Sequence, residues 1–475
     1  LLRNDFDLPL INISSEVSAL EKKHQTLISQ HKVVPIEKNN KLYLALANPN
    51  NLLGITAFKR AINQTFTLCL SYADQIEDKC LRLKNHKLEN LNHTENNIDA
   101  LIQLAITEKA SDIHFESLAT ELRIRFRIDG LLKLVKRIHN TDKNNLINQL
   151  KILAKLDISE QRLPQDGQIS FQNNLSCRIS TCPTIYGEKI VLRLLTSFKT
   201  PDITALGMSN SQQTQFKTAI EKPQGLILVT GPTGSGKTIT LYSALDYLNT
   251  IQKNICTVED PVEIPLAGIN QINIQPKIGL DFANCLKTLL RQDPDIIMIG
   301  EIRDPETAEM AIQAALTGHL VLSTVHTNDA PSAVSRLLEL GVPAYLIRAT
   351  LLGIMAQRLV RTLCEHCKST QEMEAASWQG LTQPWSVTKP AKSFHAEGCL
   401  ECRNTGYVGR QGIYEILPMS ENIKKLVGND TDLSAIRQQG MREGMRTLRL
   451  SGAQKVAAGT TTIEEVLRVT PAAEQ

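Results

Sequence analysis

One octapeptide constrains the fold of this 475-residue chain more than any other segment. Residues 231–238 read Gly-Pro-Thr-Gly-Ser-Gly-Lys-Thr, which is the GxxxxGK[ST] spacing of a phosphate-binding loop, or P-loop. The loop follows the apolar run Leu226 to Val229, a predicted strand, and it opens a predicted helix. In such a loop the backbone N–H groups cradle a triphosphate, Lys237 reaches the β- and γ-phosphates and Thr238 binds Mg²⁺. The segment predicts nucleotide binding and leaves the choice between ATP and GTP open.

The candidate nucleotide-binding residues of this loop are Gly231, Pro232, Thr233, Gly234, Ser235, Gly236, Lys237 and Thr238.

Around the loop, strands and helices alternate in a pattern typical of the α/β class. Apolar runs at 254–258, 296–299 and 320–325 predict further strands. Asp304, Pro305 and Gly318 have the residue types that begin and end a helix between the last two. We therefore expect a parallel sheet with the P-loop at the carboxyl ends of its strands.

Two glutamates follow strands of this sheet and are candidate catalytic acids. Glu301 ends the run 295–300, where a nucleotide-binding fold places the carboxylate that orients water or holds Mg²⁺. An Asp usually precedes this Glu, and here Gly300 takes its place. Glu259 ends the strand before it, and a plain capping or surface role is the alternative for that residue.

His319 and His326 bracket the predicted strand at 320–325. An imidazole beside a γ-phosphate could sense whether the phosphate is present, whereas a histidine near a strand end is more often structural. Both histidines stay candidates for the site because they lie in the P-loop domain.

Four cysteines form two CxxC pairs, Cys364 with Cys367 and Cys399 with Cys402. Four thiolates complete a tetrahedral shell around Zn²⁺ and leave no open position, so the sequence predicts a structural zinc site. A pair of free redox dithiols is the alternative.

The chain before the P-loop domain predicts two further domains. Runs at 32–36 and 42–46 predict strands near the N-terminus. Leu122 to Ile128 alternates strictly and places Arg123, Arg125 and Arg127 on one strand face, either a basic wall of the nucleotide cleft or a solvated surface. We divide the chain into an N-terminal α/β domain at 1–85, a polar linker at 86–97, a small α+β domain at 98–205, the P-loop domain at 206–363, a paired-cysteine segment at 364–412 and a helical C-terminal domain at 413–475.

Composition excludes several classes of protein. The chain carries 52 Lys and Arg against 49 Asp and Glu, and only 4% of its residues are aromatic, so neither a general phosphate-binding surface nor a base-stacking platform is expected. No apolar run approaches the roughly 20 residues that span a bilayer, and the first residues lack the build of a signal peptide. The chain does not begin with Met, so we expect its natural N-terminus to lie elsewhere.

Several motifs together resemble the ATPases of type II secretion and type IV pilus assembly. Beside the P-loop, the matching stretches are TVEDPVE at 257–263, LRQDPDIIMIGEIRD at 290–304, TGHLVLSTVHTND at 317–329, IMAQRLVRTLC at 354–364, GYVGRQGIYE at 406–415, SDIHFE at 111–116, RLPQDGQISF at 162–171 and PTIYGEKIVLRLL at 183–195. The likeness extends over about residues 98–470. It mixes features of both branches, so it leaves secretion and pilus assembly equally open.

This resemblance implies a RecA-like P-loop core, a PAS-like form for the α+β domain and an N-terminal docking domain. It implies a cytoplasmic homo-hexamer that hydrolyses ATP with Mg²⁺ and reaches the inner membrane only through platform and docking proteins. Glu259, Glu301, His319 and His326 match the family's acidic, Walker B and histidine boxes, so Gly300 is a family trait. Arg178, Arg193 and Arg291 match family arginines that approach the phosphates. Lys287 stands where relatives tend to have another arginine.

Two other functions compete with this one. A ring motor that translocates nucleic acid has a similar core, but the charge balance and low aromatic content argue against it. The presence of Lys237, Thr238, Glu259 and Glu301 together argues against a nucleotide-dependent scaffold without turnover. The N-terminal region lacks the repeated Arg-Leu-Gly type of motif that would favour cyclic-dinucleotide binding.

Overall fold

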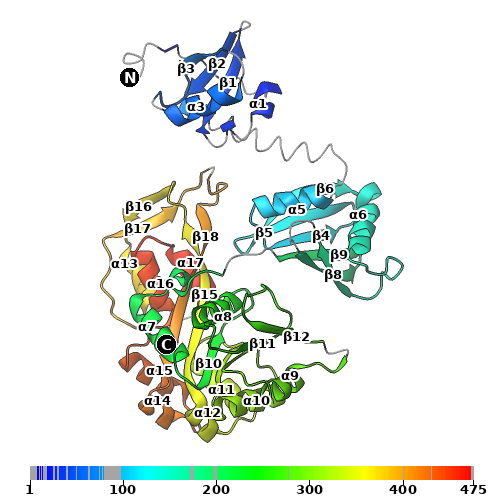
Figure 1. Ribbon diagram of the computed structural model, residues 1–475. Coiled ribbons are helices and arrows are strands. Elements are labelled where there is room, and N and C mark those ends of the chain that lie inside the picture. Colours follow the sequence, from blue (N-terminus) through cyan, green and yellow to red (C-terminus); the bar gives the residue numbers. More distant parts are fainter. Residues whose placement is uncertain are drawn as a thin grey trace. The chain divides into compact units, whose positions relative to one another are not determined.

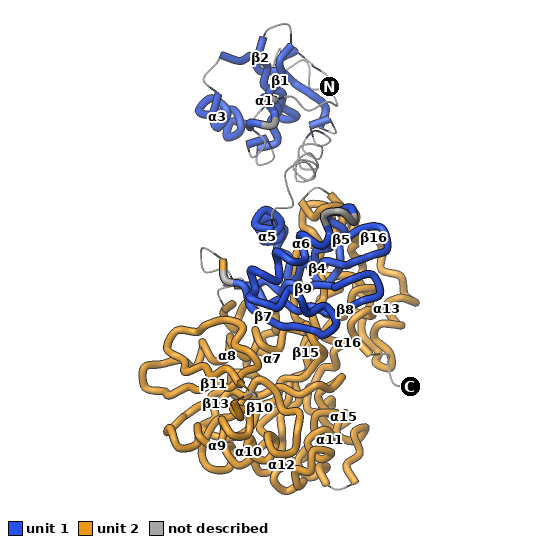
Figure 2. Tube along the Cα trace, turned by 90° about the vertical axis from the view of Figure 1, so that its right-hand side faces the viewer, with its two compact units in different colours: residues 1–169, 177–194 blue, residues 170–176, 195–475 orange. Residues whose placement is uncertain are grey.

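The structure is a computed structural model that describes most of the chain. The described residues are 8–9, 11, 13, 19–24, 27–28, 31–38, 41–49, 51–62, 65–73, 75–76, 79, 98–171, 176–195, 200–275, 278–399, 401–428 and 430–471. The linker expected at 86–97 lies outside them. The chain forms two compact units, residues 1–169 with 177–194 and residues 170–176 with 195–475 (Figure 2).

In the first unit, the N-terminal region contains a three-stranded sheet in the order β1-β2-β3. Strands β1 (Val33–Lys38) and β2 (Lys41–Leu46) are antiparallel, as the two apolar runs predicted. Helix α3 (Leu52–Ala61) connects β2 to the parallel strand β3 (Thr67–Leu70). A short helix α1 (Ala19–Lys23) precedes them.

The rest of the first unit is the expected α+β fold. A six-stranded sheet has the order β6-β5-β4-β9-β8-β7, with helices α5 (Ile98–Thr107) and α6 (Asn140–Leu153) beside it (Figure 1). Its strands are β4 (Asp112–Ser117), β5 (Glu121–Ile128), β6 (Leu131–His139), β7 (Gln165–Ser170), β8 (Ser176–Thr184) and β9 (Gly187–Leu195). The alternation in β5 is confirmed, because Leu122, Ile124 and Phe126 are fully buried.

The second unit is built on a seven-stranded sheet in the order β12-β11-β13-β14-β10-β15-β18 (Figure 1). Neighbouring strands pair in parallel except β15 with β18. The strands are β10 (Gly225–Thr230), β11 (Ile255–Glu259), β12 (Asn270–Asn273), β13 (Ile296–Ile299), β14 (Leu320–Val325), β15 (Leu351–Leu363) and β18 (Tyr407–Pro418). The α/β P-loop fold is therefore confirmed.

Helices cover both faces of this sheet, which explains why its central strands β10, β13 and β14 are buried at every position. In β10, Leu226 and Leu228 belong to one apolar cluster, whereas Ile227 and Val229 belong to another on the opposite face. The first cluster includes helices α9 (Phe282–Leu289), α10 (Pro305–Leu316), α11 (Pro331–Glu339) and α12 (Ala344–Thr350). The second includes α7 (Asn210–Ile220) and α8 (Lys237–Leu248).

The segment between β15 and β18 carries the paired cysteines. It contains a hairpin of β16 (Lys368–Glu372) and β17 (Lys392–Ala396), with helix α13 (Ala375–Thr382) between the two strands. The helical prediction for 413–475 is wrong over 413–418, because those residues complete β18 at the edge of the main sheet. Helices follow only afterwards, as α14 (Glu421–Leu426), α15 (Leu433–Arg442), α16 (Leu448–Ala457) and α17 (Ile463–Val469).

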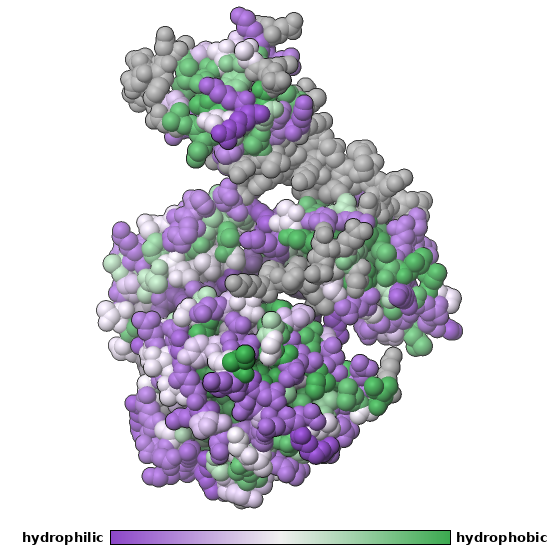
Figure 3. Space-filling model, viewed as in Figure 1, coloured by the Kyte–Doolittle hydropathy of each residue, from purple (hydrophilic) through white to green (hydrophobic). Residues whose placement is uncertain are grey.

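Among the described residues, none of the helices has the length and apolar character that a membrane span requires. On the face shown in Figure 3, hydrophilic residues dominate and hydrophobic ones form only small patches.

Glu465 gives a prediction about how the last helix is held. Its side chain is buried and accepts hydrogen bonds from Arg361 (2.5 Å) and Arg468 (2.8 Å). Burial raises the pKa of the Glu465 carboxyl from 4.5, but the bonds from the two arginines outweigh burial and bring the pKa to about 2. Because this pKa is lower in the folded state, its contribution to stability is complete above about pH 4.5 and is lost as the pH falls toward 2.

We expect Glu465→Gln to lower the free energy of unfolding by about 3 kcal/mol at pH 7, since it leaves Arg361 without its buried partner. The difference from wild type should shrink between pH 4.5 and pH 3. Urea unfolding followed by tryptophan fluorescence measures it, because helix α13, which carries Trp378, packs against α16 and α17. The exposed neighbour Glu464→Gln is the control and should change little. A difference that stays constant down to pH 3 would contradict this account.

Candidate functional site

The P-loop leaves the carboxyl end of β10 and turns sharply into α8. Gly231, Gly234 and Gly236 all have positive φ, at 150°, 79° and 90°. A side chain at Gly231 would also lie 2.6 Å from the carbonyl oxygen of Gln357 on β15. Glycine is therefore required at this position both for the backbone conformation and for the close approach of β15.

Lys237, the first residue of α8, is folded back over its own loop. Its Nζ donates to the carbonyls of Gly231 (2.8 Å) and Pro232 (3.2 Å). Burial lowers the pKa of Lys237 to about 8, although the charges of Glu301 and Glu263 oppose that shift. The ammonium thus lies against the backbone carbonyls of its own loop.

Glu301 and His326 lie beside Lys237. The His326 Nε2 is 3.3 Å from a carboxylate oxygen of Glu301, whose other oxygen is 2.6 Å from Arg303. Burial lowers the pKa of His326, and the nearby Lys237 lowers it further, while Glu301 raises it. These three predicted residues come together because β10, β13 and β14 are adjacent and parallel, so their carboxyl ends share one edge.

The structure gives a steric reason for Gly300 before this glutamate. A Cβ there would lie 3.3 Å from the Val258 carbonyl and 3.4 Å from the Glu259 Cα on β11. A side chain in this position would therefore require the Val258 carbonyl to shift by a few tenths of an ångström, whereas glycine fits without any shift.

Glu259 is buried and fully hydrogen-bonded. Tyr242 of α8 donates to one of its oxygens, and Thr257 (2.5 Å) and Gln271 (3.2 Å) donate to the other. Burial and the bond to Glu259 raise the pKa of Tyr242. A surface role for Glu259 is thus excluded, and Tyr242 is a partner that its place in the sequence did not indicate.

His319 and Arg291 lie at the other edge of the sheet. The His319 carbonyl accepts from Gly225 at the start of β10, and its Nδ1 is 2.9 Å from the Ala314 carbonyl. At about 3.3 Å per residue, β14 holds His319 and His326 roughly 20 Å apart. Arg291 follows α9 before β13 begins and donates to the Lys287 carbonyl, while Lys287 pairs with Glu306 at 2.6 Å. Neither His319 nor Arg291 joins the cluster around Lys237 in this chain.

Arg178 and Arg193 belong to the first unit, on the adjacent strands β8 and β9. Both are exposed, and Arg193 Nε donates to Asp112 of β4 at 3.0 Å. Arg123 and Arg125 both pair with the buried Glu116.

Arg127 lies 3.6 Å from the Asp112 carboxylate. The three alternating arginines of β5 therefore have acidic neighbours, and they do not form a purely basic face.

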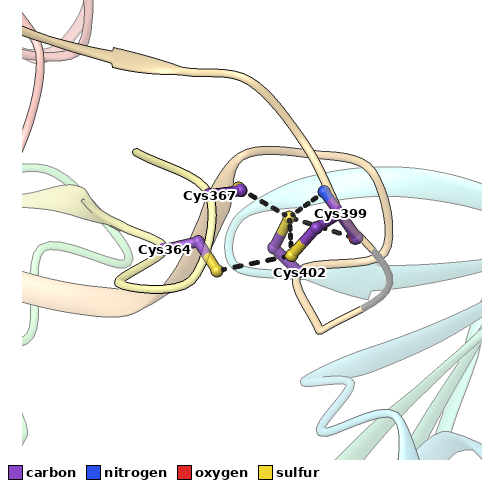
Figure 4. Close-up of side chains that lie close together, drawn as sticks. All are labelled: Cys364, Cys367, Cys399 and Cys402. Carbon is purple, nitrogen blue, oxygen red and sulfur yellow. Dashed lines mark hydrogen bonds between the residues drawn. The ribbon is translucent and has the colours of Figure 1, made fainter. Parts of the chain in front are cut away.

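The four cysteines Cys364, Cys367, Cys399 and Cys402 converge in the insert, with their sulfur atoms within 4.8 Å of one another (Figure 4). Three sulfur–sulfur distances are 3.7–3.8 Å. Tetrahedral zinc with bonds of about 2.3 Å places its sulfur ligands about 3.8 Å apart. The cluster therefore has the dimensions of a zinc site.

Sequence comparison assigns the family. Residues 87–468 match the family described as "Type II/IV secretion system protein". The type IV pilus assembly ATPase TfpB of Acinetobacter baylyi is 46% identical over 79% of this chain and 65% of that protein, slightly under two thirds of its length. The type IV pilus assembly ATPase PilB of Myxococcus xanthus is 40% identical over 98% of this chain and 89% of that protein.

The other branch is represented equally well. The type II secretion system protein E of Dickeya dadantii is 46% identical over 78% of this chain and 75% of that protein. Among solved structures, the pilus retraction motor PilT with bound ADP superimposes with a TM-score of 0.55, at 26% identity, over 79% of this chain and 98% of that one.

The fold and the cluster around Lys237 define a P-loop ATPase. The chain belongs to the type II/IV secretion system protein family, and as a member with an intact P-loop it is an ATP hydrolase of the class that serves type II secretion and type IV pilus assembly.

The close contact at Gly231 leads to a prediction about nucleotide affinity. We expect Gly231→Ala to weaken binding of a fluorescent ADP analogue about tenfold or more, since the new methyl must displace the Gln357 carbonyl or distort the loop. The control is Gly341→Ala, where φ is 83° and nothing lies within 4 Å of the added carbon. It also places an alanine at a positive φ, at a position outside the P-loop. Equal affinities for the two variants would contradict the steric account.

Proposed function

We propose that this chain binds ATP with Mg²⁺ at residues 231–238 and hydrolyses it with the help of Glu301. The observation that carries the proposal is the meeting of Lys237, Glu301 and His326 at the carboxyl edge of β10, β13 and β14. A cation for the γ-phosphate, a carboxylate for the attacking water and an imidazole thus belong to one site.

Each group has a defined task in this proposal. Lys237 exchanges its two loop carbonyls for phosphate oxygens, and Thr238 provides a hydroxyl for Mg²⁺. Glu301 orients the attacking water, and His326 reports the presence of the γ-phosphate by its contact with Glu301. Glu259 supports the site by fastening the end of β11 to α8 through Tyr242.

Arginines complete the site in this proposal. Arg178 and Arg193 are exposed and, as the family resemblance implies, would stabilise the charge that develops on the transferred phosphoryl group. Arg291 and His319, at the amino edge of the sheet, would act on the nucleotide of a neighbouring subunit. A homo-hexamer, which the family resemblance implies, would supply such a neighbour.

We further propose that hydrolysis powers assembly of a pilus or of the related fibre of type II secretion. Its support is the pair of relatives named for type IV pilus assembly and for type II secretion, which are equally identical to this chain at 46%. The motor would work in the cytoplasm and contact the inner membrane through platform proteins, with the N-terminal region, residues 1–85, as its docking domain. Because the two identities are equal, they do not favour pilus assembly over type II secretion.

The cysteine cluster adds a structural role for metal. We propose that Cys364, Cys367, Cys399 and Cys402 hold Zn²⁺, since sulfur spacings of 3.7–3.8 Å fit four thiolates around one ion. The ion would fasten the loops that join the β16–β17 hairpin to β15 and β18, the two antiparallel strands at the edge of the main sheet.

Glu301→Gln tests the proposed chemistry. We expect kcat for ATP hydrolysis to fall at least about 100-fold, because an amide cannot take up a proton from the attacking water. Affinity for ATP should stay within about threefold of wild type, since Glu301 does not hold the phosphates. Phosphate release and binding of a fluorescent ATP analogue measure the two quantities. The exposed Glu306→Gln is the matched control and should behave as wild type. Undiminished kcat in Glu301→Gln would overturn the proposal.

Metal content tests the zinc site. The purified chain should contain about one zinc ion per molecule, and Cys364→Ser with Cys402→Ser should lose it and become sensitive to proteolysis between β15 and β18. Elemental analysis and limited proteolysis provide the measurements. Cys182→Ser, which changes an exposed cysteine of the other unit, should keep its zinc. A wild-type chain that contains no zinc when prepared with added metal would rule the site out.

A further inference from the structure

Arg358 is a buried cation that no step above uses. It lies on β15, next to the P-loop strand β10, and only 5% of its surface is exposed. Its guanidinium donates to three backbone carbonyls, those of Asn328 (2.7 Å), Gln357 (2.9 Å) and Val469 (3.1 Å). The three acceptors come from different parts of the unit, so this one side chain joins them.

The first acceptor belongs to the loop that carries His326. This loop, residues 326–330, connects β14 to α11. Thr327 fastens one side of it to β10, because its N–H donates to the Thr230 hydroxyl at 2.8 Å. Arg358 fastens the next residue, Asn328, to β15. The two contacts together fix where His326 leaves the sheet edge.

The last acceptor, Val469, is the final residue of α17. The same guanidinium therefore touches the histidine loop and the end of the C-terminal helix. Arg358 also lies near the P-loop, because its Nη1 is 3.1 Å from where a side chain at Gly231 would begin. A displacement of α17 would remove one of three acceptors from a buried charge, which the other two contacts must then compensate.

The planar fork of arginine suits this position, since it can bond carbonyls in three directions at once. A lysine in its place keeps the charge but has a single nitrogen, which cannot reach all three acceptors. Arg358→Lys thus loosens the arrangement without removing the positive charge.

We propose that Arg358 is a positioning residue for ATP hydrolysis, which holds His326 against Glu301 and makes this contact depend on the docking of α17. The inference rests on the proposed function, because it acts through His326 and Glu301. It assigns the C-terminal helix a part in the reaction, since α17 must be docked for the histidine loop to be fixed.

Arg361 provides a matched control three residues further along β15. It also holds α17, through its 2.5 Å bond to Glu465, and its guanidinium lies over the ring of Tyr407, 4.0 Å from the centroid. Arg361→Lys weakens the contact in the first turn of α17, while Arg358 still holds both Val469 at the end of that helix and Asn328 in the histidine loop; Arg358→Lys loosens both of those contacts. The two effects can therefore be separated.

Steady-state kinetics of Arg358→Lys and Arg361→Lys form the first test. We expect kcat of Arg358→Lys to fall about tenfold or more with KM for ATP within about threefold, because the phosphate contacts stay in place. Arg361→Lys should keep kcat within about twofold of wild type, even if its melting temperature falls by as much as that of Arg358→Lys. Equal losses of kcat in the two variants, or a loss confined to KM, would overturn the inference.

A double variant shows whether Arg358 acts through His326. If it does, Arg358→Lys combined with His326→Gln should be about as slow as His326→Gln alone. If the double variant instead loses kcat by the product of the two single-variant losses, Arg358 acts elsewhere. An active Glu301→Gln variant would instead defeat the proposed function, so the two failures are distinguishable.

Hydrogen exchange of the wild-type chain tests the inference without any substitution. A non-hydrolysable ATP analogue with Mg²⁺ should slow amide exchange in residues 326–330 and also in the last turn of α17. Helix α14 serves as the internal reference, because in the part of the chain that the structure describes the hydrogen bonds of the Arg358 side chain go to other elements. Protection of the loop without any change in α17 would contradict the coupling.

Discussion

The close packing of the P-loop against β15 is the constraint on which the rest of the site depends. Gly231 has a φ of 150° and no space for a side chain, because the Gln357 carbonyl lies 2.6 Å from where its Cβ would be. The same strand places the Gln357 side chain, whose amide oxygen accepts from Thr240 of α8 at 2.7 Å, under the helix that begins with Lys237. The loop, the helix and β15 therefore form one packed body in which small displacements are costly.

The order of the parallel strands determines which side chains meet at the P-loop. Because β13, β14 and β10 are neighbours, Glu301, His326 and Lys237 are brought together although they lie far apart in the sequence. The same rule separates His319 and Arg291, which precede their strands and therefore lie at the opposite edge. One sheet thus offers two chemically different edges.

Much of this could be predicted from the sequence, because its strongest signals are local. The P-loop spacing, the fully apolar strands such as Leu226 to Val229 and the two CxxC pairs each need only a short window. The prediction failed at 413–418, where buried polar and aromatic residues such as Tyr414 and Glu415 give no clear strand period. It also missed Tyr242 as the partner of Glu259 and the burial of Arg358, since both depend on contacts with residues distant in the sequence. An arginine with three carbonyl acceptors cannot be told from a surface arginine by its neighbours in the chain.

The central claim is that the cluster around Lys237 hydrolyses ATP. The most direct measurement is the release of phosphate from ATP by the purified full chain, with and without Mg²⁺, beside Lys237→Ala as the blank. The account predicts saturable, Mg²⁺-dependent release by the wild-type chain and none above background in the variant. Equal release by both proteins, or release that does not require Mg²⁺, would contradict it.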